Sequence, residues 1–340
     1  MSSKNNHALL WSSPVVFGLL AAVCAPLMTS PVARSVSPLA GTVILFAAAA
    51  LLLLPASLPS LLRDARPTGR LLLRAGLAGL LLLLATAFVV MGLARGADPV
   101  ASTLFLSLLP SFSLIGRKVL WGEKLAVRQQ AGLLISLFAA SVWLSLGKAS
   151  LPFEGIFVPA SGNASFVGDA LVFVGTLLMS FAFSAGRPSE LRVSVTSWWF
   201  LVVSAGLVLS LPLMFGAHAF VYGTLVPFAG LSPERLRAEP AALLPYAFFG
   251  VTHLFFRSRL LGRSGVQLSV GTVSLVWCGT LLIAGTFIAG ALGTQTPVLH
   301  FAMLPLHLFG LCLGRDALVP WAPYVGLTEA RPIRRREEVA

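Results

Sequence analysis

Long apolar runs recur along this chain at the length needed to cross a lipid bilayer, and they restrict its fold more than any other feature. About 20 residues of helix cross the roughly 30 Å of hydrocarbon. Runs of this kind lie at about 8–28, within 36–62, within 75–94, and at 99–119, 129–146, 169–186, 193–217, 241–261, 266–290 and 298–314. A backbone in lipid must satisfy its own hydrogen bonds, so such runs predict helices. The sequence therefore predicts an all-α integral membrane protein with ten transmembrane helices.

The composition excludes an ordinary soluble domain. The mean hydropathy is +0.89, and only 11% of the residues are charged, whereas soluble domains carry about a quarter. The net charge of +12 comes from Lys and Arg in loops and in the tail, which argues against a nucleic-acid partner. Cys24, Cys278 and Cys312 are isolated within apolar runs, so they predict neither a disulfide framework nor a metal site. We expect no cofactor.

The basic residues also predict an orientation. Cytoplasmic loops of membrane proteins carry an excess of Lys and Arg. With ten spans and both termini inside, 19 of the 24 basic residues are cytoplasmic, and the exceptions are Arg34, Arg95, Lys148, Arg235 and Arg237. We therefore expect a protein of the cytoplasmic (inner) membrane with both termini in the cytoplasm and lipid as a partner. The tail Arg331–Arg336 fits either an anionic-lipid contact or an anchor for the topology.

A polar connector divides the spans into two groups of five. Residues 148–168 are rich in Pro, Gly, Ser and Asn and contain no run long enough to cross. Five is an odd number, so a second copy of the first half would enter the membrane in the opposite orientation, as in inverted-repeat transporters. We predict a first repeat at 1–150, a second, diverged repeat at 151–320 and a basic cytoplasmic tail at 321–340.

The hairpin Asp98–Gly147 carries a family pattern. It combines a Pro-Val start, a proline within the span, Gly-Glu, a basic turn, Gln and a Gly-x-x-Ile step, at Pro99-Val100, Pro110, Gly122-Glu123, Arg128, Gln130, Gly132 and Ile135. This pattern resembles the fourth and fifth helices of EamA-type drug/metabolite transporters. The second half has lost the Gly-Glu signature, because Ala289-Gly290 stands at the matching place. The resemblance implies two five-helix repeats, a central cavity for a small-molecule solute and, in some members, a homodimer.

The resemblance also implies which residues face that cavity. Its walls come from spans one, three, four, six, eight and nine, which gives as candidates Trp11, Met91, Phe183, Ser107, Ser111, Ser274 and Trp277. Packing in the core is the alternative role for each of them. For Pro110, Gly122 and Glu123 we expect a structural hinge, with Glu123 facing the positive end of the fifth helix.

Two pairs of residues that include histidine lie within spans. His253 and Arg257 are four residues apart, hence on one helix face, and His253 lies roughly 18 Å into the eighth span. They predict either a cationic spot that receives a carboxylate or phosphate, or an Arg257 that reaches the cytoplasmic surface with His253 bonded to a neighbouring helix. His300 and His307, seven apart on the tenth span, predict helix packing.

The acids point away from cation efflux. All twelve Asp and Glu residues lie at span ends, in loops or in the tail, whereas an antiporter of organic cations needs a carboxylate within the membrane. We expect a non-enzymatic transporter of a small metabolite, zwitterionic or anionic and amino-acid-like. The alternative is an integral-membrane enzyme or flippase-like subunit acting on lipid or lipid-linked substrates. An enzyme would need paired carboxylates, yet Asp98, Asp169 and Asp316 have no partner in the local sequence.

Overall fold

The computed structural model of this chain describes residues 2–30, 33, 36–63, 68–148, 164–185, 193–222, 240–256, 270–291 and 298–314. Within these ranges every regular element is a helix, which confirms the predicted all-α class. In chain order they are α1 (Ser2–Thr29), α3 (Pro38–Arg63), α4 (Gly69–Ala94), α5 (Pro99–Ser107), α6 (Leu109–Trp121), α7 (Val127–Lys148), α9 (Ala164–Ser184), α11 (Val195–Tyr222), the 3-10 helix η1 (Pro240–Leu243), α13 (Leu244–Gly250), the π-helix η2 (Val251–Phe256), α15 (Val270–Ala291) and α16 (Val298–Gly314).

The helices have the length and composition of a membrane protein. Within the described ranges, four of them are long and apolar enough to cross a bilayer by themselves, namely α3, α4, α9 and α11. The pair α5 and α6 qualifies as one bent span. Shorter apolar stretches lie at Ser13–Met28, Pro240–Phe256, Leu275–Ile288 and Met303–Gly314. Each predicted span overlaps a helix, and the crossing of the bilayer by all ten stays a prediction.

Helix α9 begins inside the connector that the sequence predicts between the halves. The sequence reading placed its end at Gly168, but α9 already begins at Ala164. Inside this helix, a Cβ added to Gly168 would lie 2.7 Å from the Ala97 nitrogen and 2.8 Å from the Gly92 carbonyl oxygen, so a larger residue would not fit. The glycine therefore permits close packing of α9 on the end of α4, where a sequence reading takes it for a break.

The predicted fourth span is two helices. The chain bends by 45° between α5 and α6. Pro110 offers no N–H to the Leu106 carbonyl, and its ring crowds that oxygen, so the α-helical ladder cannot continue through this point. The Leu108 N–H bonds the Phe105 carbonyl at 2.9 Å instead, which is the tighter i to i+3 turn.

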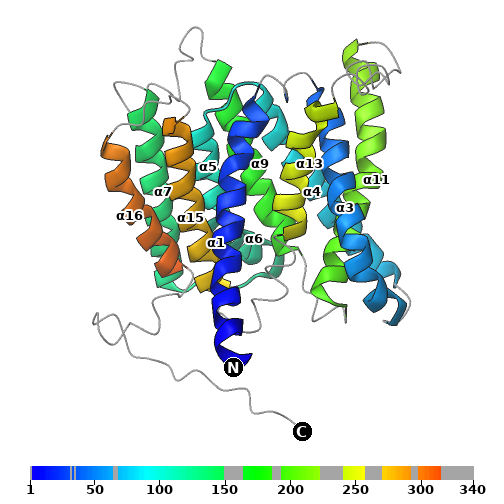
Figure 1. Cartoon of the computed structure of the whole chain (residues 1–340), viewed down its shortest axis with the longest axis horizontal. Helices are drawn as coiled ribbons and strands as arrows, with labels where there is room; N and C mark the ends of the chain where they lie inside the picture. Colours follow the sequence, from blue (N-terminus) through cyan, green and yellow to red (C-terminus); the bar gives the residue numbers. More distant parts are fainter. Residues whose placement is uncertain are drawn as a thin grey trace.

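The bent pair stands in the middle of the molecule. Residues 100–112 are all buried, so α5 has no lipid-facing side. It packs against α1, α9, α15 and α7. Figure 1 shows the helices side by side, with α7 and α16 together at one end of the long axis and α3 and α11 together at the other.

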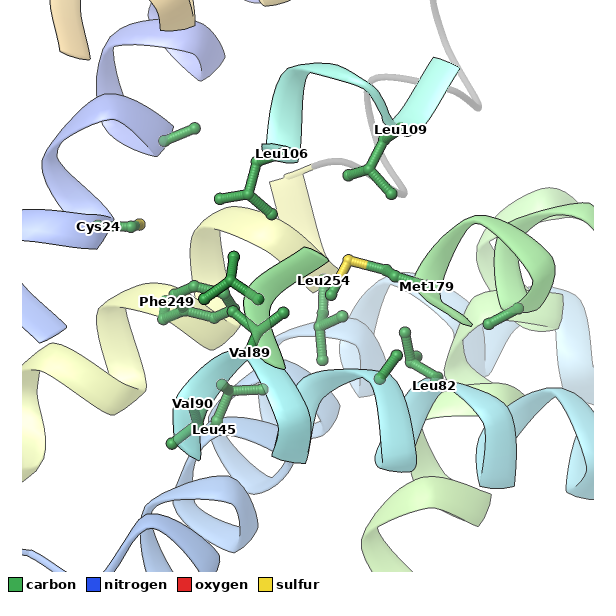
Figure 2. Close-up of a cluster of buried hydrophobic side chains, with 14 of the residues drawn as sticks. Cys24, Leu45, Leu82, Val89, Val90, Leu106, Leu109, Met179, Phe249 and Leu254 are labelled. Carbon is green, nitrogen blue, oxygen red and sulfur yellow. The ribbon is translucent and has the colours of Figure 1, made fainter. Parts of the chain in front are cut away.

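Apolar side chains fill the space beside α5. Figure 2 shows Leu106 and Leu109, on the two sides of the bend, projecting towards a cluster of side chains from other helices. Its labelled members are Cys24 of α1, Leu45 of α3, Leu82, Val89 and Val90 of α4, Met179 of α9, Phe249 of α13 and Leu254 of η2. All of them are buried, so this part of the interior is a packed core joining helices from both halves of the chain.

Candidate functional site

Polar side chains meet at the bend of the central helix. The Ser107 hydroxyl lies 3.0 Å from His307 Nε2 of α16 and 2.6 Å from the Leu104 carbonyl oxygen. The other ring nitrogen of His307, Nδ1, lies 3.3 Å from the Ser136 carbonyl oxygen of α7. The Cys278 thiol of α15 donates to the Ser107 carbonyl at 3.4 Å. These four residues, the Ser107 node, join α5 and α7 of the first half to α15 and α16 of the second.

A second irregular helix carries His253. The chain passes from α13 into a π-helical turn, η2, and π-turns are rare and occur frequently at functional sites. The His253 ring is completely buried. It stacks on Phe249 at 4.4 Å between ring centroids and meets the edge of Phe17 of α1 at 6.1 Å. Phe17 in turn contacts Trp277 of α15 at 5.3 Å. We call these four residues the His253 cluster.

Helix α15 connects the two groups. Trp277 faces α1 within the His253 cluster, while the next residue, Cys278, faces the Ser107 node. Successive residues on a helix point about 100° apart, so one turn of α15 reaches both neighbours. Three predicted cavity residues, Ser107, His253 and Trp277, thus lie around this helix.

The remaining predicted cavity residues are spread more widely. Ser111 is buried on α6, one turn beyond Ser107. Met91 on α4 is half-buried, and Phe183 on α9 contacts Trp199 of α11 edge-on at 4.8 Å. The side chains of Trp11 and Ser274 and the whole of Arg257 lie outside the described part of the structure. The proposed pairing of His253 with Arg257 therefore stays a prediction.

The expected hinge residues lie at both ends of α6. Pro110 belongs to the first turn, next to the bend at Leu108. Gly122 ends the helix with φ +65°, a left-handed conformation that glycine adopts without steric cost. Glu123 follows it and pairs with Arg117 across 3.5 Å. This ion pair is about one-third exposed, so it contributes little to stability.

Two acids that lack local partners meet in space. The Asp98 backbone N–H donates to the Asp169 carboxylate at 2.9 Å. Asp98 itself caps α5, because its carboxylate accepts from the Val100 N–H at 2.9 Å. Asp169 is buried, with 4% of its surface exposed. The Asp169 carboxylate thus holds the first turn of α5 against α9, and the Asp98 carboxylate caps that turn.

The interior offers hydroxyls, imidazoles and aromatic faces more than formal charge. Among the side chains that the structure describes as buried, Asp169 is the one carboxylate and no Lys or Arg is found. In the same residues no group of three His, Cys, Asp or Glu lies close enough to hold a metal ion.

Sequence reasoning missed the partners of Ser107. It assigned His307 to helix packing, gave Cys278 no site, and did not name Ser136. It also did not name Phe17 of the His253 cluster. A usable signal for Ser107 was its position three residues before Pro110, next to an expected break in the helix. There its hydroxyl donates to the Leu104 carbonyl, which has lost its usual donor, the Leu108 N–H. No local signal pairs it with a residue 200 positions away.

Comparison with known proteins adds little. No family model matches the sequence, and no curated protein matches it either. Fourteen chains of solved structures match. One of them, described only as a crystal structure of a protein, has 17% identity and a TM-score of 0.49 over 90% of this chain and 99% of its own. At that similarity it bears on neither family nor activity.

Proposed function

We propose that this chain is a membrane transporter of the drug/metabolite type, which moves a small organic solute through the interior by alternating access. In this proposal the two halves of the chain are inverted copies that rock against each other. The chain lies in the inner membrane with both termini in the cytoplasm. It performs no covalent chemistry on its solute.

The observation that carries the proposal is an exchange symmetry in the helix packing. We count α5 with α6 as the fourth span and α13 with η2 as the eighth. Each span of the first half then has a counterpart in the second half, five spans further along the chain. Counterparts pack on each other in three cases, α3 with α11, α5 with α15 and α7 with α16. Several of the remaining contacts come in pairs related by the exchange, whereas α3 on α4, α1 on α4, α1 on α5 and α16 on α6 have no counterpart of similar extent among the described residues. Thus α1 on α15 corresponds to α9 on α5 and α6, and α4 on α11 corresponds to α13 and η2 on α3.

An exchange of this kind is expected for two homologous halves. Each half has an odd number of spans, so the exchange implies opposite orientations in the membrane. The pair α4 on α9 likewise has its counterpart in α13 on α1. Bistable packing between two such halves is how transporters of this architecture open alternately to each side.

The irregular helices support a binding region near the middle of the membrane. Transporter sites typically lie where helices are interrupted at mid-bilayer. Here α5 and α6 are interrupted at Leu108, and the eighth span changes to a π-turn at His253. The hydroxyl and imidazole groups at these points suit a solute with both donors and acceptors. A carboxylate on that solute would account for a nearby cationic Arg257, as the sequence predicts.

Ligand screening followed by uptake tests the proposal. Purified protein in detergent is heated with individual amino acids and organic acids, since a ligand of the folded state raises the apparent melting temperature. Any hit is then assayed for uptake into proteoliposomes. We expect His253→Ala to reduce uptake by about tenfold, as for the loss of one good polar contact of about 1.4 kcal/mol. Phe287→Ala, at a side chain 69% exposed to lipid, is the matched control.

The outcomes separate the candidate functions. Uptake that survives in His253→Ala removes His253 from the solute site. A purified protein that transports none of the screened solutes but modifies a lipid-linked substrate contradicts the transporter proposal and favours the enzyme.

A further inference from the structure

The Ser107 node joins a titratable side chain to the point where the central helix breaks. His307 is completely buried, yet both of its ring nitrogens face polar oxygens. Its backbone carbonyl is also engaged, because the Ser136 hydroxyl donates to it at 3.5 Å. The ring is therefore fixed in orientation from two sides.

Counting hydrogens at the node leads to a definite protonation scheme. A carbonyl oxygen can only accept, so the contact with Ser136 requires a proton on His307 Nδ1. The 2.6 Å contact with the Leu104 carbonyl requires that the single Ser107 hydroxyl hydrogen point there. Nε2 must then donate to the Ser107 oxygen. All three contacts are hydrogen bonds at once only when the imidazole carries protons on both nitrogens.

A neutral ring forces Ser107 to choose. With Nδ1 protonated, Nε2 becomes an acceptor and draws the Ser107 hydroxyl hydrogen away from the Leu104 carbonyl. That carbonyl has already lost its usual helical donor, since the Leu108 N–H is diverted to Phe105. An amide oxygen left without a donor in the interior is costly. Straightening the bend would return the Leu108 N–H to Leu104, so the neutral ring favours the straighter helix.

The groups around His307 provide no counter-ion of their own. It is packed among α5, α6, α7, α15 and α16. Within their described bounds these helices contain no Asp or Glu, and their titratable residues are Arg117, Lys118, Arg128, Lys148, Cys278, His300 and Cys312. An imidazolium without a carboxylate partner is stabilised by water and lost on closure. Protonation of the ring therefore requires that water reach it.

We propose that His307 binds and releases a proton at Nε2, and that this proton sets the bend between α5 and α6. The proton comes from water on the side to which the interior is open, forms the Nε2–H bond and returns to water on release. Proton uptake frees Ser107 to satisfy Leu104 and stabilises the bent form. Its use as the coupling step of transport rests on the proposed function, whereas the linkage of proton and bend does not.

Nitrogen NMR of histidine side chains tests the binding step. The protein is labelled with ¹⁵N-histidine, and the His307 signals are assigned by their loss in His307→Gln, or by elimination with single Gln variants of the other four histidines, His7, His218, His253 and His300. We expect the neutral ring to carry its proton on Nδ1, and Nε2 to gain a proton as the pH is lowered. A neutral ring protonated on Nε2, or a ring that does not titrate, overturns the proposal.

Hydrogen exchange of the backbone tests the link to the bend. After correction for the chemical effect of pH, amides of residues 104–113 should exchange at rates that differ severalfold between a pH above and a pH below the NMR titration of His307. Ser107→Ala should remove this difference while leaving the NMR titration of His307 in place. His253→Gln, in the other irregular helix, should retain it. Equal exchange at both pH values in the wild type overturns the linkage.

These measurements need no solute. A protein that transports none of the solutes tested but shows the titration and the exchange difference contradicts the proposed function and supports this inference. Transport of a solute without either signal does the reverse.

Discussion

Asp169 and Glu123 are both carboxylates close to a helix end, but their surroundings lead to different contributions to stability. Asp169 is buried on α9 and accepts the Asp98 N–H. Glu123 faces Arg117 at 3.5 Å with about a third of its side chain exposed. A buried acceptor leaves an unsatisfied donor behind when it is removed, whereas water replaces the partner of an exposed ion pair.

We therefore expect Asp169→Ala to lower the free energy of unfolding by about 1–3 kcal/mol. Glu123→Ala should change it by less than about 1 kcal/mol. Thermal unfolding of both variants in the same detergent measures the difference, and Asp169→Asn, which keeps an acceptor oxygen, should fall between Asp169→Ala and the wild type. Equal losses in the two alanine variants would mean that the Asp98–Asp169 contact does not hold α5.

At the scale of the element, the bend between α5 and α6 combines a cost in stability with a use in function. A proline within a helix destabilises it by about 3 kcal/mol. Here the bend is enclosed on all sides, so neighbouring helices hold it in place. Residues that store strain at functional sites often raise stability when they are replaced and lower activity.

Pro110→Ala should raise the unfolding free energy by about 1–3 kcal/mol, because an alanine N–H can reach the Leu106 carbonyl. The same change should reduce uptake into proteoliposomes by at least about tenfold if the bend is part of the transport cycle. Pro59→Ala, at an exposed proline within α3, is the control and should leave uptake unchanged. Normal uptake by Pro110→Ala would separate the bend from transport.

The contact of α7 with α16 depends on small residues. A Cβ on Gly132 would meet backbone atoms of Gly310 and Gly314, which cannot move aside without separating the helices. Small residues allow such close approach in membranes, where van der Waals packing rather than water drives association.

Gly132→Ala is expected to lower the unfolding free energy by about 1–3 kcal/mol through overpacking. Gly76→Ala is the matched control, because a Cβ at Gly76 meets nothing within 4 Å. In an open helical position alanine is favoured over glycine by about 0.5–1 kcal/mol, so Gly76→Ala should stabilise slightly. Melting temperatures of opposite sign would verify the close contact, and a neutral Gly132→Ala would contradict it.

At the scale of the whole molecule, the proposed exchange symmetry of the packing and the distribution of basic residues together predict the topology. Helices that are counterparts in the two halves must run in opposite directions through the bilayer when each half has five spans. The excess of Lys and Arg in alternate loops predicts which loops are cytoplasmic.

Reporter fusions check this topology. A reporter active only in the cytoplasm should be active after Arg336 and inactive when fused within residues 151–160. A reporter active only outside should give the opposite result. Activity of both fusions on one side would require an even number of spans between them, in the second half, and it would remove the basis for inverted repeats.

The sequence by itself determined the helical class and the approximate positions of the helices, and it predicted the division into two groups of five spans. Each of these follows from local composition, because bilayer solvation acts on every residue of a run and needs no distant partner. The bend near Pro110 was also local, since a missing N–H affects only its own helix.

Only the tertiary structure decided which residues meet. The contact of Ser107 with His307, the stacking of His253 within an aromatic cluster and the engagement of Asp169 by Asp98 join residues from separate helices. In lipid, apolar helix faces resemble one another, so hydropathy does not specify which pair in contact. That choice comes from shape and from a few polar groups that satisfy each other across the helices, and it becomes visible only once the helices are placed.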